Sequence, residues 1–185
     1  MTMDESVANW MHAHATPTVT GAMRMITTLG APWFVTIATL MFVGVLLLIR
    51  ERYMALQLGF CVTAGMLLNT GLKNVFDRAR PNLEPALAHA VGFSFPSGHV
   101  AAATLLYGCI AVLAWQRISS LSGRVAVACI SFILVQLVAL SRVYLVVHYL
   151  TDVVVAQVVA VAWLAVSLIA FEVFRRRRDS LRQLP

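Results

Sequence analysis

The sequence predicts an all-α fold, a polytopic membrane bundle with five to six membrane helices. Of its 185 residues, 60% are hydrophobic and only 12% are charged. A soluble domain is closer to half apolar and a quarter charged. The apolar residues form continuous runs of about 20 residues, the length needed to cross a bilayer as a helix. Strands are not expected, because a short polytopic chain must satisfy its backbone hydrogen bonds internally.

Five apolar runs are expected to span the membrane and to form one transmembrane bundle over residues 31–174. The fourth is the shortest, so its ends are the least well defined by the pattern. In chain order the runs are Ala31–Ile49, Tyr53–Leu72, Ser97–Gln116, Arg124–Leu140 and Leu150–Phe174.

Residues 1–30 are predicted to form a helical segment at the membrane interface. Charged residues and histidines interrupt its apolar character, whereas the apolar positions keep helical spacing. We expect an amphipathic helix or helix pair, broken near Pro17 and Gly21, with Trp10 and Trp33 as interface anchors. A sixth membrane span is the alternative. Residues 175–185, which contain four consecutive arginines, are expected to form a basic cytoplasmic tail.

A first polar cluster follows the second apolar run and includes Lys73, Arg80 and Pro81. Lys73 and Arg80 are seven residues apart, so they would share one face of a continued helix. Pro81 would then end that helix. Arginine offers a planar fork for two phosphate oxygens, and lysine acts as a compact charge. Asp77 and Arg78 fall outside this face and are interpreted as surface groups.

A second cluster, Pro96-Ser-Gly-His99, immediately precedes the third run. The start of a helix presents free N–H groups and a positive dipole end, which together favour an anion. Ser97 is expected to cap the helix and to donate its hydroxyl, and Gly98 leaves room for a phosphate near the backbone. By itself this tetrapeptide would favour a simple helix cap. His99 adds a titratable group at the same place.

A third cluster, at the junction of the fourth and fifth runs, contains Arg142, His148 and Asp152. A spacing of four residues makes His148 and Asp152 neighbours on a helix. The carboxylate would then hold one ring nitrogen and leave the other available as a nucleophile. The alternative is a buried pair that merely satisfies two polar groups. The presence of the other two clusters favours the catalytic interpretation.

The motifs Lys-x6-Arg-Pro, Pro-Ser-Gly-His and Ser-Arg-x5-His-x3-Asp occur here in order and complete. With them the chain resembles the type 2 phosphatidic acid phosphatase superfamily, which includes membrane lipid phosphate phosphatases, over about residues 20–172. The resemblance implies that His148 attacks phosphorus to form a phosphohistidine and that Asp152 orients it. His99 would protonate the leaving oxygen and later activate water. The phosphoryl oxygens would be held by Lys73, Arg80, Ser97, Gly98 and Arg142.

The expected function is hydrolysis of a lipid phosphate, with phosphatidate (phosphatidic acid), phosphatidylglycerophosphate or undecaprenyl diphosphate as candidate substrates. The alternatives are a lipid phosphotransferase that uses the same intermediate and a non-catalytic lipid-binding or transport protein. Three fixed cations can neutralise the phosphate without a metal, so no cofactor and no metal are expected. His12 and His14 lack a third ligand, and Glu84 and His89 are interpreted as solvated loop residues.

The net charge of +6 reflects 14 basic against eight acidic residues. Most of the basic residues flank apolar runs, which is typical of membrane anchors and argues against a nucleic-acid partner. The positive-inside tendency then places the C-terminus in the cytoplasm and the three polar clusters on the extracytoplasmic face of a bacterial inner (plasma) membrane. The sequence does not define an oligomeric state. The flanking cations assigned to the cytoplasmic side are Arg50, Arg52, Arg117, Arg124, Arg175 to Arg178 and Arg182.

Overall fold

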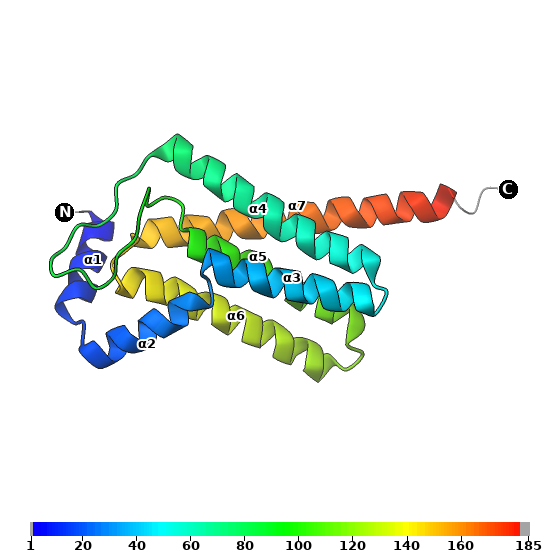
Figure 1. The fold of residues 1–185 in the computed structure, drawn as a ribbon, viewed down its shortest axis with the longest axis horizontal. Coiled ribbons are helices and arrows are strands. Elements are labelled where there is room, and N and C mark those ends of the chain that lie inside the picture. The colour runs from blue at the N-terminus through cyan, green and yellow to red at the C-terminus, as the bar shows by residue number, and fades with distance from the viewer. Residues whose placement is uncertain (1, 182–185) are drawn as a thin grey trace.

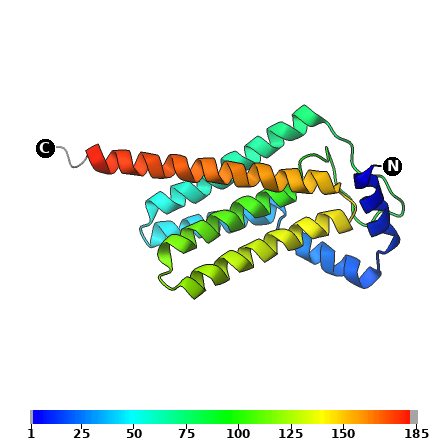
Figure 2. The ribbon, with the colours of Figure 1, turned by 180° about the vertical axis from the view of Figure 1, so that it is seen from behind.

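The computed structural model describes residues 2–181, which form seven helices and, within that range, no strand (Figures 1 and 2). The four long helices α4 to α7 run alongside one another, with α5 between its neighbours, and the short α1 and α2 lie across one end. The predicted all-α membrane bundle is thereby confirmed. The helices are α1 Met3–Ala13, α2 Pro17–Thr28, α3 Pro32–Leu48, α4 Arg52–Phe76, α5 Gly98–Arg117, α6 Leu121–Tyr144 and α7 Leu150–Leu181.

Helices α4, α5, α6 and α7 are each long and apolar enough to cross a bilayer. Helix α3 has 17 residues and meets that criterion only when it is joined to α2, from which it is bent by 42°. Helices α1 and α2, with 11 and 12 residues, are too short to span alone. The predicted N-terminal helix pair is therefore present, and the alternative of a separate sixth span is not.

The break between α1 and α2 lies at residues 14–16, just before Pro17. Proline is favoured in the first turn of a helix because its missing N–H would have no partner there. Gly21, which was expected to mark this break together with Pro17, lies within α2. Thr2 and Glu5 form a capping box at the start of α1, in which each side chain accepts a hydrogen bond from the other's backbone N–H.

Helix α5 forms the centre of the bundle. Its buried residues include the run Ala101–Ala103, together with Leu105, Leu106 and Cys109. Alanine side chains allow neighbouring helices to approach closely, and the resulting van der Waals packing favours helix association inside a bilayer. Helices α4, α6 and α7 all pack on α5, so the ends of these helices are held in a fixed relation to one another.

Helix α4 ends earlier than the sequence pattern predicts. Phe76 is its last residue, and Asp77 takes a left-handed conformation (φ 45°) that turns the chain away. Arg80 therefore lies in an irregular loop, so the predictions that it shares a helix face with Lys73 and that Pro81 ends the helix are wrong. The loop continues as far as Ser97 and folds back over the end of the bundle (Figure 1).

Helix α7 continues past residue 174 without a break, so Arg175 to Arg178 are helical and the helix extends beyond the rest of the bundle (Figure 2). Glu172 forms ion pairs with Arg175 and Arg176 one turn later. The end of the predicted basic tail, residues 182–185, lies outside the described residues.

The turn between α2 and α3 sets the position of α5 through Gly30. A Cβ atom at Gly30 would lie 2.5 Å from Val138 Cγ1 and 2.7 Å from the backbone oxygen of His99. We predict that Gly30→Ala lowers the thermal stability of the purified protein, because overpacking costs about 1–3 kcal/mol. Gly21→Ala is the matched control. A Cβ there meets nothing within 4 Å and relieves a helical glycine, so stability should be unchanged or higher. Equal melting temperatures for wild type and Gly30→Ala would contradict this close contact.

Candidate active site

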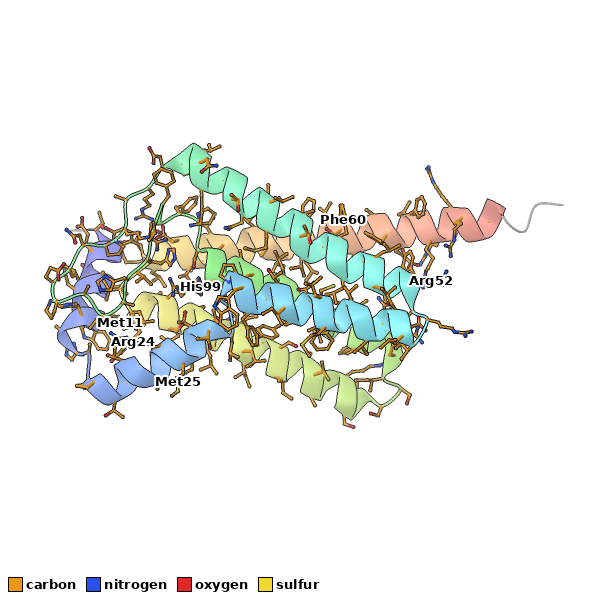
Figure 3. All side chains as sticks on the ribbon, viewed as in Figure 1. Met11, Arg24, Met25, Arg52, Phe60 and His99 are labelled. Atoms are coloured by element: carbon orange, nitrogen blue, oxygen red, sulfur yellow. The ribbon has the colours of Figure 1, made fainter. Side chains whose placement is uncertain are left out.

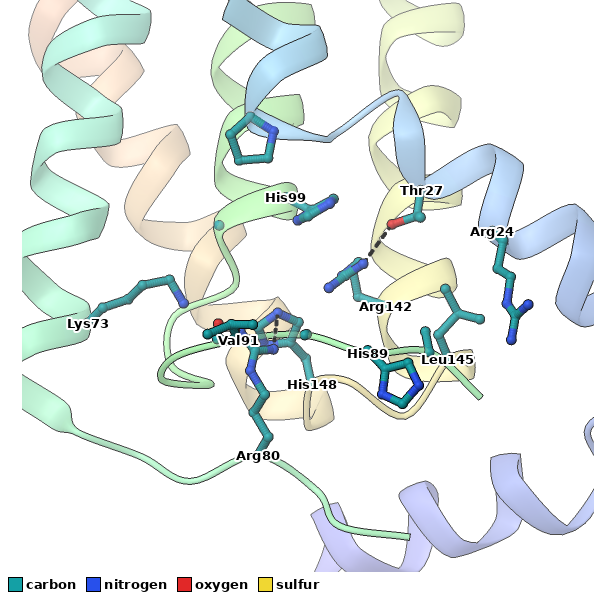
Figure 4. A pocket seen from close by; sticks show the side chains of 14 residues that line it. Arg24, Thr27, Lys73, Arg80, His89, Val91, His99, Arg142, Leu145 and His148 are labelled. Atoms are coloured by element: carbon teal, nitrogen blue, oxygen red, sulfur yellow. Dashed lines mark hydrogen bonds between the residues drawn. The ribbon is translucent and has the colours of Figure 1, made fainter. Parts of the chain in front are cut away.

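A cavity of about 720 Å³ opens at the end of the bundle that carries α1 and α2. It lies where α4 and α6 end and where α5 and α7 begin. Figure 4 shows the basic side chains converging on it from these helices and from the loop after α4. Six of the eight predicted site residues line the cavity, whereas Ser97 and Asp152 are fully buried beside lining residues. The six are Lys73, Arg80, Gly98, His99, Arg142 and His148.

His148 lies in the turn between α6 and α7, not on a helix as the four-residue spacing suggested. This turn includes Val146 in a left-handed conformation (φ 53°), and it brings the ring of His148 against the first turn of α7. His148 is only 2% exposed. Its Nδ1 lies 3.6 Å from Asp152 Oδ2 and 3.3 Å from Ser94 Oγ, and Ser94 donates to Asp152 Oδ2 at 2.5 Å.

The other ring nitrogen of His148, Nε2, faces the cavity and lies 3.2 Å from Arg80 Nη1. A guanidinium can only donate, so this contact requires a lone pair on Nε2 and a proton on Nδ1. Burial lowers the pKa of His148 to about 4, and the positive charges of Arg142, Arg80 and Lys73 act in the same direction against the opposing effect of Asp152. The imidazole is therefore neutral at pH 7, with Nε2 available as a nucleophile.

The cations around the cavity are held by carbonyl and hydroxyl oxygens. Lys73 Nζ donates to Phe93 O at 2.9 Å, and Arg142 Nη1 donates to Thr27 Oγ1 at 2.9 Å. Arg80 donates to the backbone oxygens of residues 91, 92, 93 and 147. Among the described residues, none of these three cations forms an ion pair with a carboxylate. Within residues 2–181 these three cations are therefore uncompensated by an ion pair, and the charge of Asp152 acts on Lys73 and Arg80 only from a distance.

The start of α5 completes the wall of this cavity. Ser97 is the N-cap residue, but its hydroxyl makes no capping bond; it is buried and has no hydrogen-bond partner in the described part of the chain. The prediction that Ser97 caps the helix is therefore wrong. Instead the backbone N–H of Ser97 donates to the carbonyl oxygen of Asp152 at 3.2 Å, which joins the starts of α5 and α7. Gly98 and His99 both line the cavity.

The match to known proteins covers most of the chain. A family model described as the PAP2 superfamily matches residues 54–176. The chain belongs to the PAP2 superfamily. Phosphatidylglycerophosphatase B of Bacillus subtilis (strain 168) is 33% identical over 151 residues, which are 81% of this chain and 74% of that protein. The predicted resemblance is thereby confirmed, and the chain is a PAP2-type phosphatase, a hydrolase.

Two solved structures share the fold. One is the crystal structure of a transmembrane PAP2 type phosphatidylglycerolphosphate phosphatase from Bacillus subtilis, with a TM-score of 0.81 and 30% identity. The alignment covers 94% of this chain and 85% of that one. The other is LpxE of Aquifex aeolicus, with a TM-score of 0.72 over 91% of this chain and 96% of its own. At 20% identity, the second comparison shows the fold alone. This PAP2 phosphatase is thus a multi-pass membrane protein.

Arg78, interpreted from the sequence as a surface group, is part of the site of this PAP2 phosphatase. Its Nη1 donates to Asp152 Oδ1 at 2.6 Å, and its Nη2 donates to Asp4 Oδ2 at 2.8 Å. The guanidinium also lies 4.3 Å from the centre of the Tyr149 ring.

Ser94 was not predicted from the sequence either, because no motif marks it. Nothing in the sequence joins Asp4 to residues near 150.

The loop over the cavity is held by the N-terminal helices. His12 Nε2 lies 2.9 Å from Pro85 O, and Arg24 donates to Leu87 O through Nε at 3.1 Å and Nη2 at 2.6 Å. Arg24 and His89 both line the outer part of the cavity (Figure 4). His89 is an exposed loop residue, as expected from the sequence, and it lies beside this part of the cavity. The described residues contain no group of three metal-ligating side chains, and His14 bonds to Trp10 O.

We predict that removing the hydroxyl of Ser94 and removing that of Ser97 affect the stability of the protein differently. Ser94→Ala removes a hydrogen bond to a buried carboxylate, which contributes about 1.5–3 kcal/mol, so we predict a lower melting temperature and lower activity. Ser97→Ala removes a buried hydroxyl without a protein partner, so we predict unchanged or higher stability but weaker inhibition by inorganic phosphate. Thermal unfolding and phosphate inhibition of both variants, measured in one detergent, test this pair. A destabilised Ser97→Ala protein with normal phosphate inhibition would contradict the assignment.

Proposed function

We propose that this PAP2 phosphatase removes the terminal phosphate of phosphatidylglycerophosphate through a covalent phosphohistidine at His148. The observation that carries the proposal is the contact geometry of His148. One nitrogen is held by Ser94 and Asp152, and the other faces a cavity lined by uncompensated cations. A buried structural histidine needs no lone pair that faces a cation-lined cavity, whereas a nucleophile that attacks an anionic phosphate does.

In the proposed first step, Nε2 of His148 forms a bond to phosphorus as the bond from phosphorus to the lipid oxygen breaks. Protonated His99 donates its proton to that oxygen, which leaves as the hydroxyl of the lipid product. Asp152 stabilises the positive charge that develops on the phosphorylated ring. In the second step His99 accepts a proton from water, the water oxygen attacks phosphorus, and the bond to Nε2 breaks to release inorganic phosphate.

The transition state spreads negative charge over the equatorial phosphoryl oxygens. Lys73, Arg80 and Arg142 surround the position that these oxygens would occupy, and the free hydroxyl of Ser97 and the N–H groups at the start of α5 supply further donors. These groups are held in place by the helix ends and the loop, so little reorganisation is needed during the reaction. The substrate's own negative charge favours the protonated form of His99.

The choice of substrate rests on Arg24, a basic residue of the cavity outside the group formed by Lys73, Arg80 and Arg142. Arg24 is held by a carbonyl oxygen and has no carboxylate partner in the described residues, so the cavity carries a fourth uncompensated cation, with His89 nearby. A phosphate monoester brings two negative charges at most. Phosphatidylglycerophosphate brings a further phosphodiester charge, which matches the outer cation. Its hydrolysis is also what the name of the Bacillus subtilis relative describes.

The test is phosphate release by the purified protein in excess EDTA, with phosphatidylglycerophosphate, phosphatidate and undecaprenyl diphosphate presented in identical mixed micelles. We predict that phosphatidylglycerophosphate is hydrolysed with the highest kcat/KM, that chelation has no effect, and that His148→Ala is inactive. A loss of activity in EDTA that Mg²⁺ restores would contradict the metal-free chemistry.

The other outcomes of this experiment discriminate among the alternatives. A preference for the diphosphate would change the proposed substrate but not the mechanism. Transfer of labelled phosphate to an acceptor lipid would indicate a phosphotransferase, and tight binding without turnover would indicate a lipid-binding or transport protein.

Arg24→Gln, which keeps a donor for Leu87 O, should lower kcat/KM for phosphatidylglycerophosphate more than for phosphatidate. Arg117→Gln, at the far end of the bundle and paired with Glu51, is the control for loss of charge.

We also propose that the cavity opens on the extracytoplasmic side of a bacterial plasma membrane. Arg52 lies at the end of the bundle remote from Arg24 and His99 (Figure 3). The turns after α3 and α5 lie at that same remote end, as does the C-terminal part of α7 (Figure 1). Basic residues gather at these places, which favours the cytoplasm for that end.

Labelling of single introduced cysteines tests this orientation in spheroplasts. In a Cys129→Ala background, Ala86→Cys in the cavity loop should react with a membrane-impermeant maleimide. Ser119→Cys, in the turn between α5 and α6, should react only after lysis. Both positions are exposed, so accessibility to the reagent depends on the side of the membrane. The reverse pattern would place the cavity in the cytoplasm.

A further inference from the structure

Asp4 is a carboxylate buried against the start of a helix far away in the sequence. It lies in the first turn of α1, where acidic side chains are ordinarily solvated, yet it is only 7% exposed. Its Oδ1 accepts from the backbone N–H of Thr151 at 3.1 Å, and its Oδ2 accepts from Thr151 Oγ1 at 2.5 Å. The carboxylate therefore satisfies the first turn of α7, where a negative charge is favoured by the helix dipole.

The same carboxylate shares a guanidinium with the aspartate that orients His148. Arg78 donates through Nη2 to Asp4 and through Nη1 to Asp152 Oδ1. The other oxygen of Asp152 accepts from Ser94 Oγ and from the backbone N–H of Tyr149 at 2.9 Å, and faces His148 Nδ1. An unbroken series of contacts thus joins α1 to the imidazole.

The charges along this series leave one negative charge next to His148. Two carboxylates share one guanidinium, so Asp4, Arg78 and Asp152 together carry a net charge of −1. Burial raises the pKa of Asp4, but hydrogen bonds from Thr151 and Arg78 outweigh this effect and lower it, so Asp4 is ionised at neutral pH. If Asp4 were neutral, Arg78 would cancel the charge of Asp152 and the phosphorylated ring would lose its counter-charge.

We propose that Asp4 is a positioning residue for phosphoryl transfer, which orients the first turn of α7 and holds the charge of Arg78 so that Asp152 keeps its negative charge toward His148. This inference rests on the proposed function of His148. It also gives α1 a role in the chemistry, because the N-terminal helix then completes the charge balance of the site.

The first test compares Asp4→Asn with Asp77→Asn on the preferred lipid. The Asp4→Asn substitution keeps the side-chain shape and an acceptor for the Thr151 N–H but removes the charge. We expect kcat to fall about tenfold, the rate equivalent of one pKa unit, with KM within about twofold of the wild type. Asp77 is an exposed neighbour of Arg78 that forms no ion pair among the described residues, so Asp77→Asn should leave both constants unchanged. A wild-type kcat for a folded Asp4→Asn protein would overturn the proposal.

The second test distinguishes charge balance from general disruption. The double variant with Asp4→Asn and Arg78→Gln has no charge at either position and keeps a donor toward Asp152, so the net charge next to His148 returns to −1. We expect it to recover several-fold in kcat over Asp4→Asn alone, whereas a purely structural role predicts a further loss. If Asp4→Asn does not fold, the double variant decides. A folded and active double variant supports the proposal, and an inactive or unfolded one overturns it. Activity surviving in His148→Ala would instead refute the proposed function.

Discussion

The uncompensated positive charge of the cavity is the constraint on which the rest of the site depends. Lys73, Arg80 and Arg142 are brought together at one end of the bundle, and each is held by uncharged oxygens. Two of them share the carbonyl of Phe93. Like charges so close together repel one another, and in a partly buried site this repulsion is only weakly screened. An anionic group that enters the cavity relieves this repulsion, and a transition state with more charge on its oxygens relieves it further.

Two groups of basic residues in the described part of the chain differ in their partners. Arg78, Arg117, Arg175 and Arg176 pair with carboxylates, whereas the cations that line the cavity do not. The first group has carboxylate partners within the fold, although Arg175 and Arg176 share Glu172. This division separates cations that hold the structure together from cations that are available to a substrate, and it places Arg24 with the second group.

The bundle brings the site together through helix ends. Because successive helices alternate in direction, the end of α4, the start of α5, the end of α6 and the start of α7 meet at one surface. The small residues of α5 let the other helices pack closely, so these ends are held firmly. Side chains at helix termini and in connecting loops can thus be positioned as well as those within a helix. The loop after α4 adds Arg80 and Ser94, and contacts from His12 and Arg24 hold that loop in place.

The sequence was sufficient to predict the membrane bundle, the N-terminal helix pair and the convergence of the three motifs. The lengths of the apolar runs determine the helices, and the alternating direction of successive helices determines which of their ends meet. Both can be worked out from the order of the runs along the sequence. Other features depend on contacts between distant residues. The contacts of Asp4 with Arg78 and Thr151 join residues that are 74 and 147 positions apart, so no local pattern could reveal them.

Backbone geometry accounts for the remaining errors. Asp77 ends α4 through a left-handed conformation, and His148 approaches Asp152 from a turn and not along a helix. The spacing rules gave the right neighbours for an incorrect reason, since both a helical turn and this tight turn bring residues four apart into contact. Ser97 does not cap α5 through its side chain, and its buried hydroxyl has no partner within residues 2–181.

Trapping the phosphorylated protein tests the proposed chemistry of His148 directly. Protein mixed with phosphatidylglycerophosphate labelled in its terminal phosphate would be quenched in alkali, where a phosphorus–nitrogen bond survives, then digested and sequenced by tandem mass spectrometry. We expect label on His148, formed within the time of one turnover and absent from His148→Ala. Label on another residue, or steady phosphate release with no phosphorylated protein at any time point, would contradict this chemistry.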